Sequence, residues 1–162
     1  MKTTDITKLQ AFMRNGNWGS VYDILDDARK RAISPEDVKR EVYWRAMALE
    51  GQQRYEEALE LLQKNTNLFN CQSLVYHELA CILVKLGLNQ DALTEIEKAP
   101  IEEEMESFYG LAIDAKFFYF YLLAKSGDTS IKERLSEIPD DYHYIAMGGT
   151  FLTKADIVSL LK

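Results

Sequence analysis

The sequence lacks any apolar run long enough to cross a bilayer, and its N-terminus lacks the uninterrupted apolar core of a signal peptide. Membrane insertion is therefore not expected. Cysteine is scarce as well, because only Cys71 and Cys81 are present. Two cysteines cannot form the framework of a disulfide-stapled fold, and Cys81 lies in a helical pattern as a small apolar residue. These absences predict a cytoplasmic protein with reduced thiols.

Basic charge is limited, with 19 Lys and Arg against 26 Asp and Glu and a net charge of −7. Nucleic-acid binding depends on cations that neutralise phosphates, so this balance argues against a nucleic-acid partner. The densest basic run, residues 29–31, follows Asp26 and Asp27 and lies at a predicted helix end, where cations meet the negative end of the helix dipole. A partner that is itself basic suits the acidic chain better.

Proline is limited to Pro35, Pro100 and Pro139, which all fall where helices are expected to begin or end. The interiors of the periodic segments are unbroken, which predicts an all-α fold. A chain of 162 residues is the size of one domain, so we expect residues 1–162 to form a single one.

The clearest pattern is a helical hairpin over residues 76–99, with its turn at residues 86–89. Apolar residues recur at helical spacing on both sides, and Gly87 and Asn89 end one helix and begin the next. A similar arrangement lies 34 residues upstream of Ala92, around Ala58. One hairpin cannot bury both sides of its helices, so a repeat of this length predicts that hairpins stack on one another.

Other helices are expected from the same signals. Ser34 as a cap with Pro35 at the first helical position gives the strongest start. Thr153 with Asp156 caps the last helix. The expected segments are approximately residues 5–15, 18–32, 35–51, 54–64, 102–126, 131–138 and 153–161.

Two segments leave alternatives open. Residues 117–123 are apolar on every side and could form a buried strand, but the length of the surrounding periodicity favours a helix. In the tail, residues 142–147 are interpreted as one or two further helical turns, ended by Gly148 and Gly149. We expect residues 138–162 to form the capping tail that the last hairpin needs.

The pattern resembles the tetratricopeptide repeat, a helix-turn-helix unit of 34 residues. Two units match in register, with small or apolar residues at Ala46, Leu49, Tyr55, Ala58 and Leu62 and at Tyr76, Leu79, Ala80, Leu83, Gly87, Ala92, Ile96 and Ala99. A weaker unit precedes them, and a degenerate fourth carries Lys132 where a small residue is usual. The resemblance covers most of residues 4–138 and implies a right-handed α-solenoid of such hairpins with a C-terminal capping helix.

Stacking would leave one concave wall made from the first helix of every hairpin. In this register the wall presents Ile6, Gln10 and Met13, then Arg40, Tyr43, Met47 and Glu50, then Leu74, His77, Cys81 and Val84, then Asp114, Phe117 and Tyr121. Its apolar and aromatic character suits an amphipathic helix or an extended peptide. Packing in the core is the alternative interpretation of every one of these residues.

Some members of the family clamp a terminal carboxylate with Lys and Asn side chains. Here Tyr43, Met47, His77 and Cys81 stand at the matching places, so the resemblance does not imply that role.

Few residues are suited to catalysis or metal binding. His77 and Cys81 lie four apart and could face each other on a helix, but they lack a third supporting group and further metal ligands. Residues 146–150 contain two glycines without a following lysine or a preceding strand, so a connector is favoured over a phosphate loop. We therefore predict no catalytic residue, metal or cofactor.

The sequence thus predicts a non-catalytic protein-binding module, an adaptor or scaffold that holds a peptide or helix in its groove. The alternative is a dedicated inhibitor, such as an immunity protein, or a secretion chaperone for one cognate toxin or effector, and an enzyme using His77 or Glu50 is the third class. The oligomeric state does not follow from the sequence.

Overall fold

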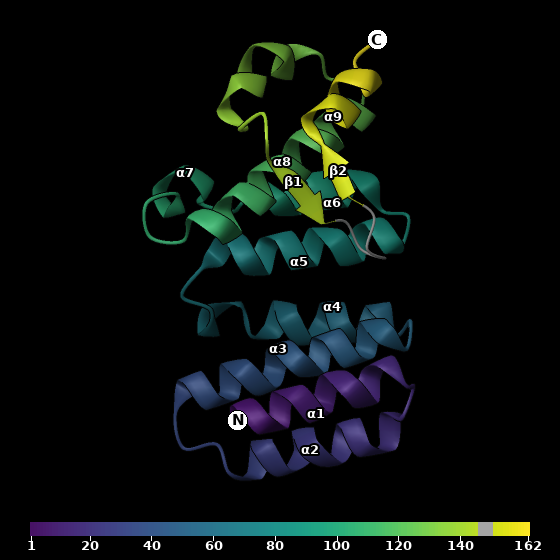
Figure 1. Cartoon of the computed structure of the whole chain (residues 1–162), viewed down its shortest axis with the longest axis vertical. Helices are drawn as coiled ribbons and strands as arrows, with labels where there is room; N and C mark the ends of the chain where they lie inside the picture. Colours follow the sequence, from purple (N-terminus) through teal and green to yellow (C-terminus); the bar gives the residue numbers. More distant parts are fainter. Residues whose placement is uncertain (146–150) are drawn as a thin grey trace. The chain divides into compact units, whose positions relative to one another are not determined.

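The computed structural model describes residues 1–145 and 151–162 (Figure 1). The described chain is mostly helical, which confirms the all-α class, and the one exception is a short two-stranded sheet near the C-terminus. The chain divides into two compact units, Met1–Asn70 and Cys71–Lys162. Two compact units can belong to one domain, so the expectation of a single domain stays a prediction.

The first unit consists of two helical hairpins and a short 3-10 turn. The helices are α1 (Thr3–Arg14), α2 (Trp18–Lys30), α3 (Pro35–Gly51), α4 (Tyr55–Lys64) and the turn η1 (Thr66–Leu68). Each helix lies beside the next one along the chain, since α1 packs on α2, α2 on α3 and α3 on α4 (Figure 1). The core between the first three is built from Leu9, Val21, Leu25 and Ala48.

Local signals fix the helix starts in this unit. The Ser34 hydroxyl accepts the backbone N–H of Asp37 at 3.2 Å and Pro35 opens α3, as the sequence predicts. The first helix begins at Thr3, earlier than the expected start near residue 5, and Asp5 at its third position accepts the backbone N–H of Lys2 at 3.1 Å.

The second unit contains the hairpin predicted at residues 76–99. Its helices are α5 (Gln72–Lys85) and α6 (Asn89–Ile96), joined by a turn in which Gly87 has a φ of +78°. That left-handed conformation is readily available to glycine only, so Gly87 allows the sharp reversal.

The long helix expected at residues 102–126 is in fact two helices, α7 (Ile101–Glu104) and α8 (Tyr109–Lys125). The carboxylate of Glu104, the last residue of α7, reaches the start of α5. It accepts the backbone N–H groups of Gln72 and Ser73, both at 2.7 Å, and the Cys71 thiol lies 3.3 Å away. Glu104 therefore caps the start of α5 rather than the start of the helix to which it belongs.

The helical interpretation of residues 117–123 is confirmed, because they lie inside α8. The helix is apolar on every side because several neighbours cover it: α5, α6, α7, α9 (Lys154–Leu160), the strand β1 (His143–Ile145) and the 3-10 helix η2 (Ser130–Glu137) all contact it.

The tail departs from the prediction. Residues 143–145 form β1, which pairs antiparallel with β2 (Phe151–Thr153) in the register His143 to Thr153 and Ile145 to Phe151. Alternation explains the strand, since Tyr144 is buried while His143 and Ile145 are exposed. The Thr153 and Asp156 cap of α9 is confirmed by a capping box. The predicted connector at residues 146–150 lies outside the described residues.

Candidate functional site

In the part of the chain that the structure describes, no cluster of three or more His, Cys, Asp or Glu side chains could hold a metal ion. The predicted pair of His77 and Cys81 meets the phenol of Tyr144 instead, with the hydroxyl 2.7 Å from His77 Nε2 and 3.8 Å from Cys81 Sγ. Burial lowers the pKa of His77 to about 4, so the imidazole is neutral near pH 7 and is a poor proton donor.

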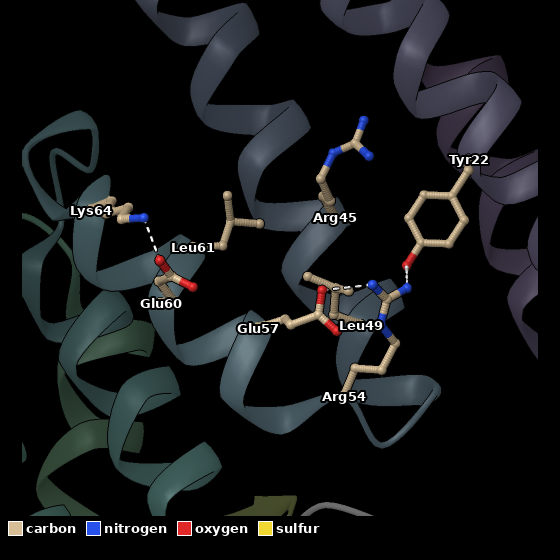
Figure 2. A pocket seen from close by; sticks show the side chains of 8 residues that line it. All are labelled: Tyr22, Arg45, Leu49, Arg54, Glu57, Glu60, Leu61 and Lys64. Carbon is tan, nitrogen blue, oxygen red and sulfur yellow. Dashed lines mark hydrogen bonds and ion pairs between the residues drawn. The ribbon is translucent and has the colours of Figure 1, made fainter.

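A pocket of about 340 Å³ lies between α2, α3 and α4 in the first unit. Figure 2 shows its lining, with Arg54, Glu57 and Tyr22 converging at one end and Lys64 beside Glu60 at the other. Arg54 binds Glu57 through two hydrogen bonds of 2.7 and 2.6 Å, and its Nη1 lies 3.5 Å from the Tyr22 hydroxyl.

Every cation that lines this pocket has a carboxylate partner. Lys64 pairs with Glu60, and Arg45 pairs with Glu41 and with Asp26, the latter at 2.7 Å. Such pairs leave little net positive charge for an anionic ligand, and the Arg45–Asp26 pair links α3 to α2. We therefore assign this pocket to helix packing rather than to ligand recognition.

The predicted groove residues divide between the two units. In the first unit they lie on α3: Arg40 is exposed and pairs with Glu36 at 3.2 Å, Tyr43 and Met47 are half-buried, and Glu50 is buried. Residues 40, 43, 44 and 47 follow the spacing of one helical face. Arg40, Tyr43 and Met47 therefore share an accessible stripe, whereas Glu50 has little surface to offer a partner.

A second pocket, of about 420 Å³, opens beside this stripe. It is lined by Gln10, Met13 and Arg14 of α1 and by Trp44 of α3. The Trp44 ring meets the Tyr43 ring edge to face, with centroids 5.7 Å apart. We call this surface the α1–α3 face and define it by Gln10, Met13, Arg14, Arg40, Tyr43, Trp44 and Met47.

The sequence prediction missed Trp44 and Arg14. Gln10 and Met13 stood on the predicted wall, and Arg14 follows Gln10 by four residues, which places these two side chains side by side on a helix. Trp44 falls four residues after Arg40 and three before Met47, so the spacing that selected those residues would also have selected Trp44.

In the second unit the predicted groove residues lie beneath or beside the tail. Phe117 is fully buried and Cys81 is 4% exposed, so neither side chain is open to a partner in this conformation. Asp114 accepts a hydrogen bond from the Tyr142 hydroxyl. Leu74 and Tyr121 are half-buried, and Tyr121 lies under the Lys125 ammonium at 5.5 Å.

Charge separates sharply between the units. Residues 1–70 hold eleven acidic and eleven basic side chains, whereas residues 71–162 hold fifteen acidic and eight basic. The net charge of −7 therefore belongs entirely to the second unit. Electrostatic attraction of a basic protein would act on that unit rather than on the α1–α3 face.

No known protein family, curated protein or solved structure matches the chain. The resemblance to the tetratricopeptide repeat therefore stays a prediction that rests on the spacing of residues. In the described residues, no helix combines the length and apolar character needed to cross a bilayer.

Proposed function

We propose that this protein is a non-catalytic binding module that holds an apolar segment of a partner protein on the α1–α3 face. The observation that carries the proposal is the pocket beside Trp44, where the Met13 and Trp44 side chains are only half-buried and Arg14 is exposed. Aromatic residues, Met and Arg are the types enriched at the centres of protein interfaces.

The chemistry of the face defines the segment it would accept. Met13, Met47 and Trp44 offer an adaptable apolar surface that suits an apolar anchor side chain. Arg14 is exposed and lines the pocket, so an acidic residue beside that anchor would add a charge-assisted hydrogen bond. We therefore expect an amphipathic helix or peptide with an apolar stripe and a flanking carboxylate.

The predicted architecture fits this role. Consecutive helices of the first unit pack as neighbouring hairpins, and we propose that hairpins continue to stack in this way along the chain as an α-solenoid. Such an array exposes a long surface of helices, and tetratricopeptide proteins, which the sequence resembles, bind peptides on it.

A dedicated inhibitor or secretion chaperone is the second candidate. The separation of charge favours it, because a net charge of −7 confined to residues 71–162 would attract a basic toxin or effector. In that case the partner would bind the second unit and would bury a larger surface than a peptide does.

Two charge reversals on one helix test the proposal. Arg14→Glu alters the α1–α3 face, whereas Lys8→Glu makes the same charge change at an exposed position on the other side of α1. Each protein is used to capture partners from the native host, and mass spectrometry quantifies them. We expect Arg14→Glu to lose a partner that Lys8→Glu retains.

The same experiment separates the candidates. A single stoichiometric basic partner that is insensitive to Arg14→Glu, but is lost after replacing Glu102 and Glu103 with Lys, would replace the adaptor proposal with the inhibitor. Thermal unfolding of each variant confirms that the loss is not due to unfolding.

A further inference from the structure

The tail is attached to the second unit through two tyrosines that are two residues apart. Tyr142 donates its hydroxyl to Asp114, and its ring lies against Phe117 with centroids 5.5 Å apart. Tyr144 stacks on Phe117 at 5.1 Å and on Phe118 at 5.9 Å. Residues two apart in an extended chain point to the same side, so both rings can enter one surface.

We call that surface the tyrosine seat and define it by His77, Cys81, Asp114, Phe117 and Phe118. Its apolar floor comes from the two phenylalanines of α8, and its polar groups are placed for phenols. His77 Nε2 lies 2.7 Å from the Tyr144 hydroxyl, and the Asp114 carboxylate accepts the Tyr142 hydroxyl. The seat therefore selects an aromatic ring that carries a hydroxyl, at two positions.

The short hairpin that fills the seat has few stabilising interactions between its own residues. Each strand of the hairpin has three residues, and a two-stranded hairpin of that length is marginal in water without packing. Its outer face is exposed, since Ile145 and Phe151 have exposed fractions of 65% and 63%. Docking into the seat therefore contributes to the order of residues 142–145, alongside the packing of α9 on α8. Release of these residues from the seat, with α9 still packed, would be a local opening of the unit.

We propose that the tyrosine seat is a recognition site for an extended segment of another protein with tyrosines two residues apart, and that residues 142–144 are its internal occupant. A partner segment of this kind would make the contacts that the tail makes and would displace it. The inference shares the protein-binding class of the function proposed above, but it concerns a different surface.

A peptide with the sequence of residues 140–145 tests the proposal by fluorescence anisotropy. It is titrated into the wild-type chain and into a Tyr142→Ala, Tyr144→Ala variant of the full chain. A tethered occupant competes at high effective concentration, so the apparent association constant equals the intrinsic one multiplied by the fraction of seats that are open. We expect the peptide to bind the variant at least about tenfold more tightly than the wild type.

Control peptides define the specificity. The peptide with both tyrosines replaced by Ala should not bind, and the version with both replaced by Phe should bind several-fold more weakly than the parent. Arg14→Glu in the wild-type chain should leave peptide binding unchanged, which distinguishes failure of this inference from failure of the α1–α3 face.

The thiols of Cys71 and Cys81 give a readout in the wild-type chain, so this test does not depend on the folding of the variant. Cys81 lies beneath Tyr144, whereas Cys71 is buried beside Glu104. If the tail opens locally, a thiol reagent in native buffer should modify Cys81 faster than Cys71, and the peptide should slow the reaction of Cys81.

Three outcomes would overturn the proposal. Equal rates at the two cysteines would show that the tail leaves the seat only when the unit unfolds. Equal peptide affinity for the variant and the wild type would show that the tail does not compete. A dimer in solution that dissociates when the tyrosines are replaced would show that the occupant is a second copy of the chain.

Discussion

Replacing Glu104 with Gln should destabilise the second unit by about 2 kcal/mol. The carboxylate accepts two backbone N–H groups at the start of α5, both at 2.7 Å, and hydrogen bonds to a charged acceptor contribute about 1.5–3 kcal/mol each. The amide keeps one oxygen, so one bond survives in weaker form. Its NH₂ group then faces a backbone donor, which makes the second bond impossible.

The pH dependence of the free energy of unfolding gives a second test of the role of Glu104. Burial alone would raise the pKa of Glu104, but the hydrogen bonds from Ser73 and Gln72 outweigh it and lower the pKa below its ordinary value of 4.5. A carboxyl with a lowered folded pKa stabilises the fold above its unfolded pKa, and this contribution is lost as the pH falls through the folded pKa. Wild type should therefore lose more stability in acid than Glu104→Gln does.

The assay is urea unfolding followed by circular dichroism, because both tryptophans, Trp18 and Trp44, lie in the first unit. Glu106→Gln is the matched control, since Glu106 belongs to the same acidic run and is exposed. We expect that control to change the free energy of unfolding by less than about 0.5 kcal/mol. Equal effects of the two substitutions would refute the assignment of Glu104 as the cap of α5.

Two further predictions concern packing and pH. Gly51→Ala should destabilise the first unit by about 1–3 kcal/mol, because a Cβ there would meet Trp18 Cη2 at 2.6 Å. Gly19→Ala, in open space on α2, should stabilise it by up to about 1 kcal/mol. Tryptophan fluorescence during urea unfolding measures both changes, and an unchanged free energy of unfolding in Gly51→Ala would contradict the close contact. Burial lowers the pKa of His77 from 6.5 to about 4, so the neutral imidazole stabilises the fold fully above pH 6.5 and this contribution declines as the pH falls toward 4. Between pH 7.5 and 5.5 the free energy of unfolding of wild type should fall by about 1 kcal/mol more than that of His77→Gln. Identical pH profiles for wild type and His77→Gln would show that His77 is not buried in this way.

Signals within one helix or turn were readable from the sequence. Ser34 with Pro35, Gly87 in its turn, and Thr153 with Asp156 each act through neighbours a few residues away, so short patterns identify them. The helical spacing around residues 117–123 likewise predicted α8 correctly.

Contacts between distant segments were not readable. His77 and Tyr144 are 67 residues apart, and no local pattern indicates that a strand from the tail will cover α5 and α8. Glu104 belongs to an acidic run that suits its own helix start, and only the fold brings it to Gln72 and Ser73, about 30 residues away. Spacing selected Phe117 because it shows which residues share a helical face, but spacing does not show what covers that face.

The most direct test of the binding function is the affinity of a captured partner for four forms of the chain, measured by calorimetry. These are wild type, Arg14→Glu, Trp44→Ala and Tyr109→Ala, the last a substitution of an exposed aromatic residue in the second unit. We predict that Arg14→Glu and Trp44→Ala each weaken binding at least about tenfold, a change of about 1.4 kcal/mol, and that Tyr109→Ala has no effect. Unchanged affinity of both folded variants of the α1–α3 face would contradict the proposed function.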